Sequence, residues 1–322
     1  MNLLQKIANN KNIQRPVIYG LLGYELLPEE IKFFQKSAPI GFILFARNIK
    51  NKKQVRALTD SLREIMGGEV LILIDQEGGR VARLNANNDE WKKYPAAEYF
   101  GEIYKNNSRK EAKLACFENY KEIAADLKEI GINVNCAPLI DILTKKTHGI
   151  IGNRAFGSTS AQVVNLAKEV CDGLLANDVY PVIKHIPGHG RATLDSHLAL
   201  PIVNTSLEVL RKTDFIPFTK LKNEKFAMTA HILYTKIDAE LPATISKKMI
   251  NLIRDEIGFK NILMTDDLSM KALPGNFEFR TKKSLEAGCD LVLHCNGNMA
   301  EMAEIHENLP LINDKLIQKL IK

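Results

Sequence analysis

The sequence lacks the features that mark membrane and secreted proteins. No apolar stretch approaches the roughly 18 consecutive residues that a transmembrane helix requires. Residues 1–15 contain only short apolar pairs between Lys and Asn, without the continuous apolar core and small-residue cleavage site of a secretory signal. We therefore expect a cytoplasmic protein with no membrane span.

Cysteine is sparse and shows no pattern. The 322 residues include five cysteines, widely separated and without a C-x-x-C motif. An odd, scattered set argues against a disulfide framework and favours a reducing compartment. Most of the five lie in apolar runs, where buried and inert thiols are expected rather than a catalytic nucleophile.

The sequence also lacks a block of basic residues with interleaved aromatic side chains. Its net charge of +6 comes from 44 basic and 38 acidic residues that are dispersed among one another. Such dispersion is typical of a solvated surface, so we expect no nucleic-acid partner.

Short apolar runs rich in β-branched residues recur along the chain. Continuous apolar runs of this length suit strands that are buried on both faces, as in a parallel sheet. We predict eight such strands, at residues 17–19, 41–45, 70–74, 132–134, 180–183, 226–229, 262–264 and 291–293.

Segments with helical periodicity separate these runs. Residues 160–177 and 109–130 each place apolar residues on one face, and Asn51 is a candidate N-cap for another helix. In the second segment the predicted buried face is Leu114, Phe117, Tyr120, Ala124 and Leu127. Glycines follow three helical segments, where left-handed caps are expected, at Gly131, Gly258 and Gly288.

Eight strands that alternate with helices predict a (β/α)8 barrel of the TIM type. The alternative is an open doubly wound sheet, but no G-x-G-x-x-G motif follows the first strand. Because no Pro-, Gly- or Ser-rich linker divides the chain, we expect residues 1–322 to form a single catalytic barrel domain. Residues 309–322 are predicted to form an amphipathic closing helix.

Polar side chains cluster just after five of the eight predicted strands. The carboxyl-terminal ends of barrel strands form the active face of this fold. One such cluster would be ordinary turn chemistry, but the recurrence indicates one polar site. The clusters follow the third, fifth, sixth, seventh and eighth strands, at residues 75–80, 184–190, 231, 266–267 and 294–296.

These clusters carry a family resemblance. The chain resembles the family 3 glycoside hydrolases, and most closely the bacterial β-N-acetylglucosaminidases of peptidoglycan recycling. The resemblance covers roughly residues 16–296, with the motifs in the expected order. It is carried by IDQEGGRV (74–81), GNRAFG (152–157), KHIPGHG (184–190), DSH (195–197), AHI (230–232), PAT (242–244) and TDDLSM (265–270).

The resemblance implies that Asp266 is the catalytic nucleophile. A retaining glycosidase needs a carboxylate that attacks the anomeric carbon and forms a glycosyl-enzyme, which water later opens. The period-two geometry of a strand turns the neighbouring Asp267 the other way, where it could cap the following helix.

The resemblance implies a second catalytic group, His197 with Asp195. Family 3 enzymes usually use a Glu acid/base, but this branch resembles enzymes with a loop His–Asp pair. Imidazole titrates near neutrality, so it can protonate the leaving oxygen and then deprotonate water. Asp195 would hold the ring tautomer and stabilise the imidazolium.

Five further residues are expected to bind the sugar hydroxyls: Asp75, Arg83, Arg154, Lys184 and His185. A zinc site remains an alternative, because His185 and His189 have H-x-x-x-H spacing. However, Pro187 and Gly188 lie between them, so no helix would align the two rings. We therefore expect no metal and no cofactor; His189 would support the loop, and His231 would pack behind the site.

The expected function is that of a retaining exo-β-N-acetylglucosaminidase. The resemblance implies a disaccharide substrate of N-acetylglucosamine and anhydro-N-acetylmuramic acid, with or without the stem peptide. We expect a monomer. The alternatives are a metal-dependent barrel hydrolase and a carbohydrate-binding protein that has lost turnover. Because Asp266, His197 and Asp195 are all present, the sequence favours the active glycosidase.

Overall fold

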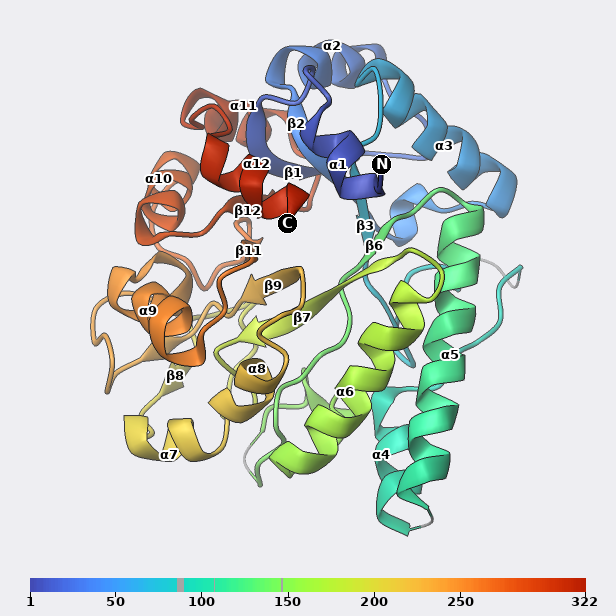
Figure 1. Cartoon of the computed structure of the whole chain (residues 1–322). Coiled ribbons are helices and arrows are strands. Elements are labelled where there is room, and N and C mark those ends of the chain that lie inside the picture. The colour runs from blue at the N-terminus through green and yellow to red at the C-terminus, as the bar shows by residue number, and fades with distance from the viewer. Residues whose placement is uncertain (86–89, 107, 146) are drawn as a thin grey trace.

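A closed barrel of parallel strands forms the centre of the molecule (Figure 1). The computed structural model describes residues 1–85, 90–106, 108–145 and 147–322. In the described residues the barrel strands follow the order β1-β12-β11-β9-β7-β6-β3-β2. Their bounds are β1 (Arg15–Gly20), β2 (Pro39–Leu44), β3 (Leu71–Ile74), β6 (Val134–Asn135), β7 (Tyr180–Ile186), β9 (Phe226–Thr229), β11 (Ile262–Asp267) and β12 (Leu291–His294).

Each predicted strand overlaps one of these barrel strands, and the (β/α)8 prediction is confirmed. The open-sheet alternative is wrong, because β1 pairs with both β2 and β12 and so closes the barrel. The predicted strand at 132–134 overlaps β6 only at Val134. Short strands outside the barrel are β4 (Gln76–Gly78), β5 (Val81–Ala82), β8 (Ile202–Val203) and β10 (Leu233–Tyr234).

The helices surround the barrel, and α5 and α6 pack against each other along its side (Figure 1). The α-helices are α1 (Leu3–Ala8), α2 (Pro28–Ser37), α3 (Lys52–Ile65), α4 (Ala97–Asn106), α5 (Arg109–Glu129), α6 (Ser160–Leu175), α7 (Leu207–Lys212), α8 (Phe215–Lys220), α9 (Lys247–Leu252), α10 (Phe277–Ala287), α11 (Met299–Glu307) and α12 (Asp314–Ile321). Single tighter or wider turns are η1 (Ala46–Asn48), η2 (Gly152–Arg154), η3 (Ala243–Ile245) and η4 (Ile253–Ile257).

The predicted helix signals are confirmed, with one exception. The Asn51 side chain accepts a hydrogen bond from the backbone N–H of Gln54 and caps α3. The three predicted glycine caps have φ of +80°, +82° and +116°. The exception is the predicted apolar face of α5, where Leu114 is 60% exposed and Phe117 is only partly buried. The buried face of that helix is instead formed by Ala112, Cys116, Asn119, Tyr120, Ile123, Ala124 and Leu127.

Alternating side chains divide the core into two layers. Along β1, Ile18 lies in the cluster inside the barrel, whereas Val17 and Tyr19 lie in the cluster between the strands and the outer helices. Helices α1 and α12 close the interior at the amino-terminal end of the strands, and they lie side by side (Figure 1). The predicted closing helix is therefore α12, and it buries Leu316 and Leu320. The opposite end of the barrel remains available for a site.

No helix among the described residues combines the length and apolarity needed to cross a bilayer.

Candidate active site

A cavity of about 520 Å³ opens where the barrel strands end at their carboxyl termini. This volume is in the range of small-molecule sites. Its walls come from the ends of β2, β3, β7, β9, β11 and β12 and from the loops that follow them. All of the predicted site residues line this cavity: Asp75, Arg83, Arg154, Lys184, His185, Asp195, His197 and Asp266.

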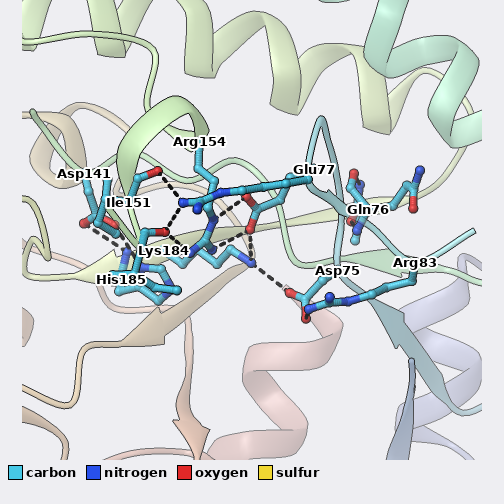
Figure 2. A network of polar contacts seen from close by, with 12 residues as sticks. Asp75, Gln76, Glu77, Arg83, Asp141, Ile151, Arg154, Lys184 and His185 are labelled. Atoms are coloured by element: carbon cyan, nitrogen blue, oxygen red, sulfur yellow. Dashed lines mark hydrogen bonds and ion pairs between the residues drawn. The ribbon is translucent and has the colours of Figure 1, made fainter. Parts of the chain in front are cut away.

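A network of opposite charges forms one wall of the cavity (Figure 2). The Lys184 Nζ atom lies 2.8 Å from Asp75 Oδ1 and 2.7 Å from Glu77 Oε1. Arg154 binds Glu77 through two hydrogen bonds, Nε–Oε2 at 2.8 Å and Nη2–Oε1 at 2.7 Å. Arg83 Nη2 lies 3.3 Å from Asp75 Oδ2. These ion pairs thus link the segment after β3 to the end of β7 at the mouth of the barrel.

The two acids in this network stay ionised despite their burial. Burial alone would raise the pKa of Glu77, but Arg154 and Lys184 outweigh it and lower that pKa to about 2. Burial likewise opposes the charge of Asp75, but Lys184 and Arg83 hold its pKa well below the usual range. Burial would lower the pKa of Lys184, but the same two acids raise it. Near neutral pH all three side chains therefore carry their charges.

Asp266 and its neighbour Asp267 have different environments at the end of β11. Both residues line the cavity, and Asp266 Oδ1 accepts the backbone N–H of Asp267 at 2.8 Å. Burial would raise the pKa of Asp266, but the nearby His231 and His185 and that backbone N–H outweigh it and lower the pKa. Asp266 is therefore a carboxylate at neutral pH.

Asp267 holds the chain in place. Its Oδ1 accepts the backbone N–H groups of Ser269 at 2.9 Å and of Cys295 at 3.1 Å. Its Oδ2 accepts the Ser269 hydroxyl at 2.6 Å. The prediction that it caps the following helix is wrong, because Asn276 caps α10. Asp267 instead joins the turn after β11 to the end of β12.

His231 lies fully buried behind Asp266, as predicted. Its Nδ1 lies 2.7 Å from Thr244 Oγ1, and its Nε2 lies 3.0 Å from the backbone oxygen of Asp267. Burial lowers its pKa, so the ring is neutral at pH 7. This histidine supports the end of β11.

His197 and Asp195 form a hydrogen-bonded pair on the loop between β7 and β8. His197 Nδ1 lies 2.9 Å from Asp195 Oδ1, and the backbone N–H of His197 donates to the same oxygen at 2.9 Å. Burial would raise the pKa of Asp195, but these hydrogen bonds outweigh it and lower the pKa. The His197 side chain is 61% exposed, so solvent reaches its ring. The pair thus presents an imidazole, backed by a carboxylate, to the cavity.

His185 and His189 meet a buried carboxylate that sequence reasoning did not single out. Asp141 Oδ2 lies 2.8 Å from His185 Nδ1, and Asp141 Oδ1 accepts the backbone N–H of His189 at 2.6 Å. Glu77 lies within the predicted polar cluster at residues 75–80, but it was not among the predicted catalytic or sugar-binding residues. Both acids could have been found from their position in the sequence, because each follows a predicted strand at the active end of the barrel.

The rings of His185 and His189 lie close together, with centroids 5.4 Å apart. The turn of the chain after β7 brings them together, and no helix aligns them. Across residues 1–85, 90–106, 108–145 and 147–322, no group of three or more His, Cys, Asp or Glu side chains is arranged to hold a metal ion. All five cysteines are buried free thiols, as predicted for core residues.

Known proteins share both the sequence and the structure of this chain. A β-hexosaminidase of Psychromonas ingrahamii is 35% identical over 288 residues, which is 88% of this chain and 83% of that protein. The crystal structure of NagZ from Neisseria gonorrhoeae in complex with N-trifluoroacetyl-D-glucosamine matches with a TM-score of 0.88 at 32% identity, over 95% of this chain and 89% of that one.

A family 3 β-N-acetylglucosaminidase from Paenibacillus matches with a TM-score of 0.84 at 29% identity, over all of this chain and 61% of that one. The model of the glycosyl hydrolase family 3 N-terminal domain matches residues 28–320. The resemblance seen in the sequence motifs is thereby confirmed, and the chain belongs to glycosyl hydrolase family 3.

Proposed function

We propose that the protein is a retaining exo-β-N-acetylglucosaminidase that works through a covalent glycosyl-enzyme. One observation carries this proposal. Asp266 on β11 and the His197–Asp195 pair on the β7–β8 loop line the same cavity, although they come from distant parts of the chain. A carboxylate and a proton-transferring group on one sugar-sized cavity are the two requirements of a retaining mechanism.

In the first step a carboxylate oxygen of Asp266 bonds to the anomeric carbon as the glycosidic C–O bond breaks. His197 donates a proton to the leaving oxygen. In the second step His197 takes a proton from water, whose oxygen displaces Asp266 and releases the sugar. The lowered pKa of Asp266 suits the nucleophile, and ionised Asp195 stabilises the imidazolium form of His197.

Glu77 is the other candidate for the acid, and its surroundings argue against it. Arg154 binds both of its oxygens, and Lys184 lies 2.7 Å from one of them. With a pKa of about 2, Glu77 has no proton to donate near neutrality. We therefore assign Glu77 to holding Arg154 and Lys184, and the proton transfer to His197.

The remaining wall residues would bind the sugar. Arg154 and Lys184 offer charged hydrogen-bond donors, and Asp75 offers acceptor oxygens. Arg83 and His185 line the same cavity. Hydroxyl groups both donate and accept, so a wall of mixed charge suits a sugar ring. The matches to a β-hexosaminidase and to NagZ with bound N-trifluoroacetyl-D-glucosamine support an amino sugar as the terminal unit.

The finer proposals follow from the same family membership. The natural substrate would be the disaccharide of N-acetylglucosamine and anhydro-N-acetylmuramic acid, with or without peptide. Residues 1–322 would act as one catalytic domain, as a monomer, in the cytoplasm.

A chromogenic β-N-acetylglucosaminide tests the proposed activity, with the β-glucoside as the control for the acetamido group. We expect release of the chromophore from the first substrate only. We also expect undiminished activity after EDTA treatment and dialysis, because the mechanism uses no metal. Absence of turnover would favour a carbohydrate-binding protein. Loss of activity that only zinc restores would favour a metal-dependent hydrolase.

A further inference from the structure

We propose that Asp141 is a positioning residue that orients the ring of His185 and anchors the start of the loop that carries His197. This inference rests on the proposed function, because it assigns Asp141 a role in the same site. Asp141 is fully buried, whereas His185 lines the cavity. Asp141 would therefore act through other residues and not by touching the substrate.

Strand pairing places Asp141 beside His185. Leu139 pairs with Lys184 in a parallel bridge, and the backbone N–H of Ile140 donates to the Lys184 oxygen at 2.8 Å. The chain after β6 thus runs alongside the end of β7, and the Asp141 side chain meets the His185 ring (Figure 2). The arrangement depends on the barrel and not on local sequence.

The first consequence concerns the His185 tautomer. Asp141 Oδ2 lies 2.8 Å from His185 Nδ1. Burial would raise the pKa of Asp141, but His185 and the His189 backbone outweigh it and lower the pKa. An ionised carboxylate only accepts hydrogen bonds, so His185 Nδ1 must carry a proton. The other ring nitrogen, Nε2, is then left to accept a hydrogen bond from a sugar hydroxyl when the ring is neutral.

The second consequence concerns the loop. Asp141 Oδ1 accepts the backbone N–H of His189 at 2.6 Å, four residues after His185. The His189 ring reaches forward, with Nε2 3.2 Å from the Ser196 hydroxyl. Burial, aided by His185, lowers the pKa of His189 to about 4, so this contact is a neutral hydrogen bond. Ser196 lies between Asp195 and His197 in the sequence. The hydrogen bonds that start at Asp141 therefore lead through His189 to the catalytic pair.

Asp141→Asn separates these two roles. The Asn side-chain oxygen can still accept the His189 backbone N–H, but its amide group would donate to His185 Nδ1. His185 must then move its proton to Nε2, which becomes a donor toward the sugar. We expect kcat/KM for the chromogenic substrate to fall about 10- to 100-fold, the range found for carboxylates that orient metal-bound histidines. Asp141→Ala removes both contacts and should lose more.

Nitrogen-15 NMR of ring-labelled histidine reads the tautomer directly, with the His185 signals assigned by their loss in His185→Ala. We expect a protonated Nδ1 in the wild type and a protonated Nε2 in Asp141→Asn. Asp238→Asn is the matched control, because Asp238 is also a buried carboxylate, bound to Ser246 Oγ at 2.6 Å and away from the cavity. That variant should keep the wild-type kcat/KM and the wild-type His185 signals.

A double-mutant comparison tests whether Asp141 acts through His185. In a His185→Ala background, Asp141→Asn should lower kcat/KM by less than about threefold, because the partner ring is already gone. An equal loss in both backgrounds would overturn the proposal. So would a wild-type His185 with its proton on Nε2, a measurement made on the wild-type protein that needs only the His185→Ala spectrum for its assignment. If the wild-type protein lacked glycosidase activity, the proposed function would fail, while the NMR result would still decide the tautomer.

Discussion

The guanidinium of Arg154 and the carboxylate of Glu77 form a two-pronged ion pair, with N–O distances of 2.7 and 2.8 Å. The two side chains are only 11% and 6% exposed, and Lys184 adds a second cation to the same carboxylate. Glu77→Gln leaves these two buried cations without part of their counter-charge. We expect the free energy of unfolding at pH 7, measured in urea, to fall by about 3–5 kcal/mol. A change below about 1 kcal/mol would contradict this view of the pair.

The same ion pair predicts a direction for the pH dependence of stability. The pKa of Glu77 is lowered from 4.5 to about 2 by the net effect of burial and its cations, so the folded state favours the ionised form. Its contribution is present above the unfolded pKa and disappears as pH falls through the folded one. The stability difference between wild type and Glu77→Gln should therefore be largest near pH 7 and shrink toward pH 3. A difference that stayed constant with pH would show that Glu77 contributes through packing.

Asp266→Asn tests the nucleophile. A carboxamide is a poor nucleophile, so we expect the hydrolysis rate to fall by several orders of magnitude. Folding should be preserved, because the Asn oxygen can still accept the Asp267 backbone N–H. A mechanism-based fluorosugar should label Asp266, and peptide mass spectrometry locates the label. Labelling of Asp267 or Glu77 would show that the assignment is wrong.

His197→Ala tests the acid/base with two leaving groups. A natural disaccharide needs protonation of its leaving oxygen, whereas a very acidic phenol does not. We expect turnover of the disaccharide to fall far more than formation of the glycosyl-enzyme from the aryl glycoside. With the aryl substrate the intermediate should accumulate, and added azide should relieve it. Pre-steady-state kinetics on both substrates measure the two steps.

Asp195→Ala should show the same dependence on the leaving group with a smaller loss of rate. Asp195 orients the His197 ring and stabilises its protonated form, but it does not transfer the proton itself. An equal slowing of glycosylation for both substrates in His197→Ala would contradict the proposed role. His197 would then position the sugar or the loop, and a glutamate would have to be reconsidered as the acid.

Asp290 tests what holds the closing helix α12 in place. Lys319 Nζ lies 2.6 and 2.7 Å from its two oxygens, and Arg254 Nη2 lies 2.7 Å from Oδ2. Asp290→Ala should lower the free energy of unfolding by about 3 kcal/mol, because it leaves two mostly buried cations without their counter-charge. Activity per folded molecule should persist, since Asp290 precedes β12 at the end of the barrel opposite the cavity.

The matched control for Asp290 is Lys282→Ala in the exposed i,i+4 pair with Glu278. Exposed pairs of this kind contribute about 0.3–0.5 kcal/mol, so urea unfolding should barely change. Equal losses in the two variants would contradict the proposed role of Asp290.

Local sequence was sufficient for the elements of the fold. Apolar runs such as 70–74 and 226–229 predict strands because most positions of a strand that is buried on both faces must be apolar. Asn51 and the glycine caps are predictable because capping depends on a few neighbouring backbone groups. Leu114 was misplaced because the face that a helix buries depends on what packs against it. In α5 the buried face contains Cys116 and Tyr120, and the helix packs against α6.

For the site, the sequence by itself determined which chemical groups follow which strands. Asp75, Lys184 and Asp266 all come at strand ends, and a parallel barrel brings those ends together. Only the tertiary structure decided how the charges pair. Glu77 and Asp141 each lie more than 40 residues from the side chains they bind, Arg154 and His185, so no local pattern reports these contacts. Closure of the barrel removes these groups from water, and burial is what makes their pairing, and hence their protonation, specific.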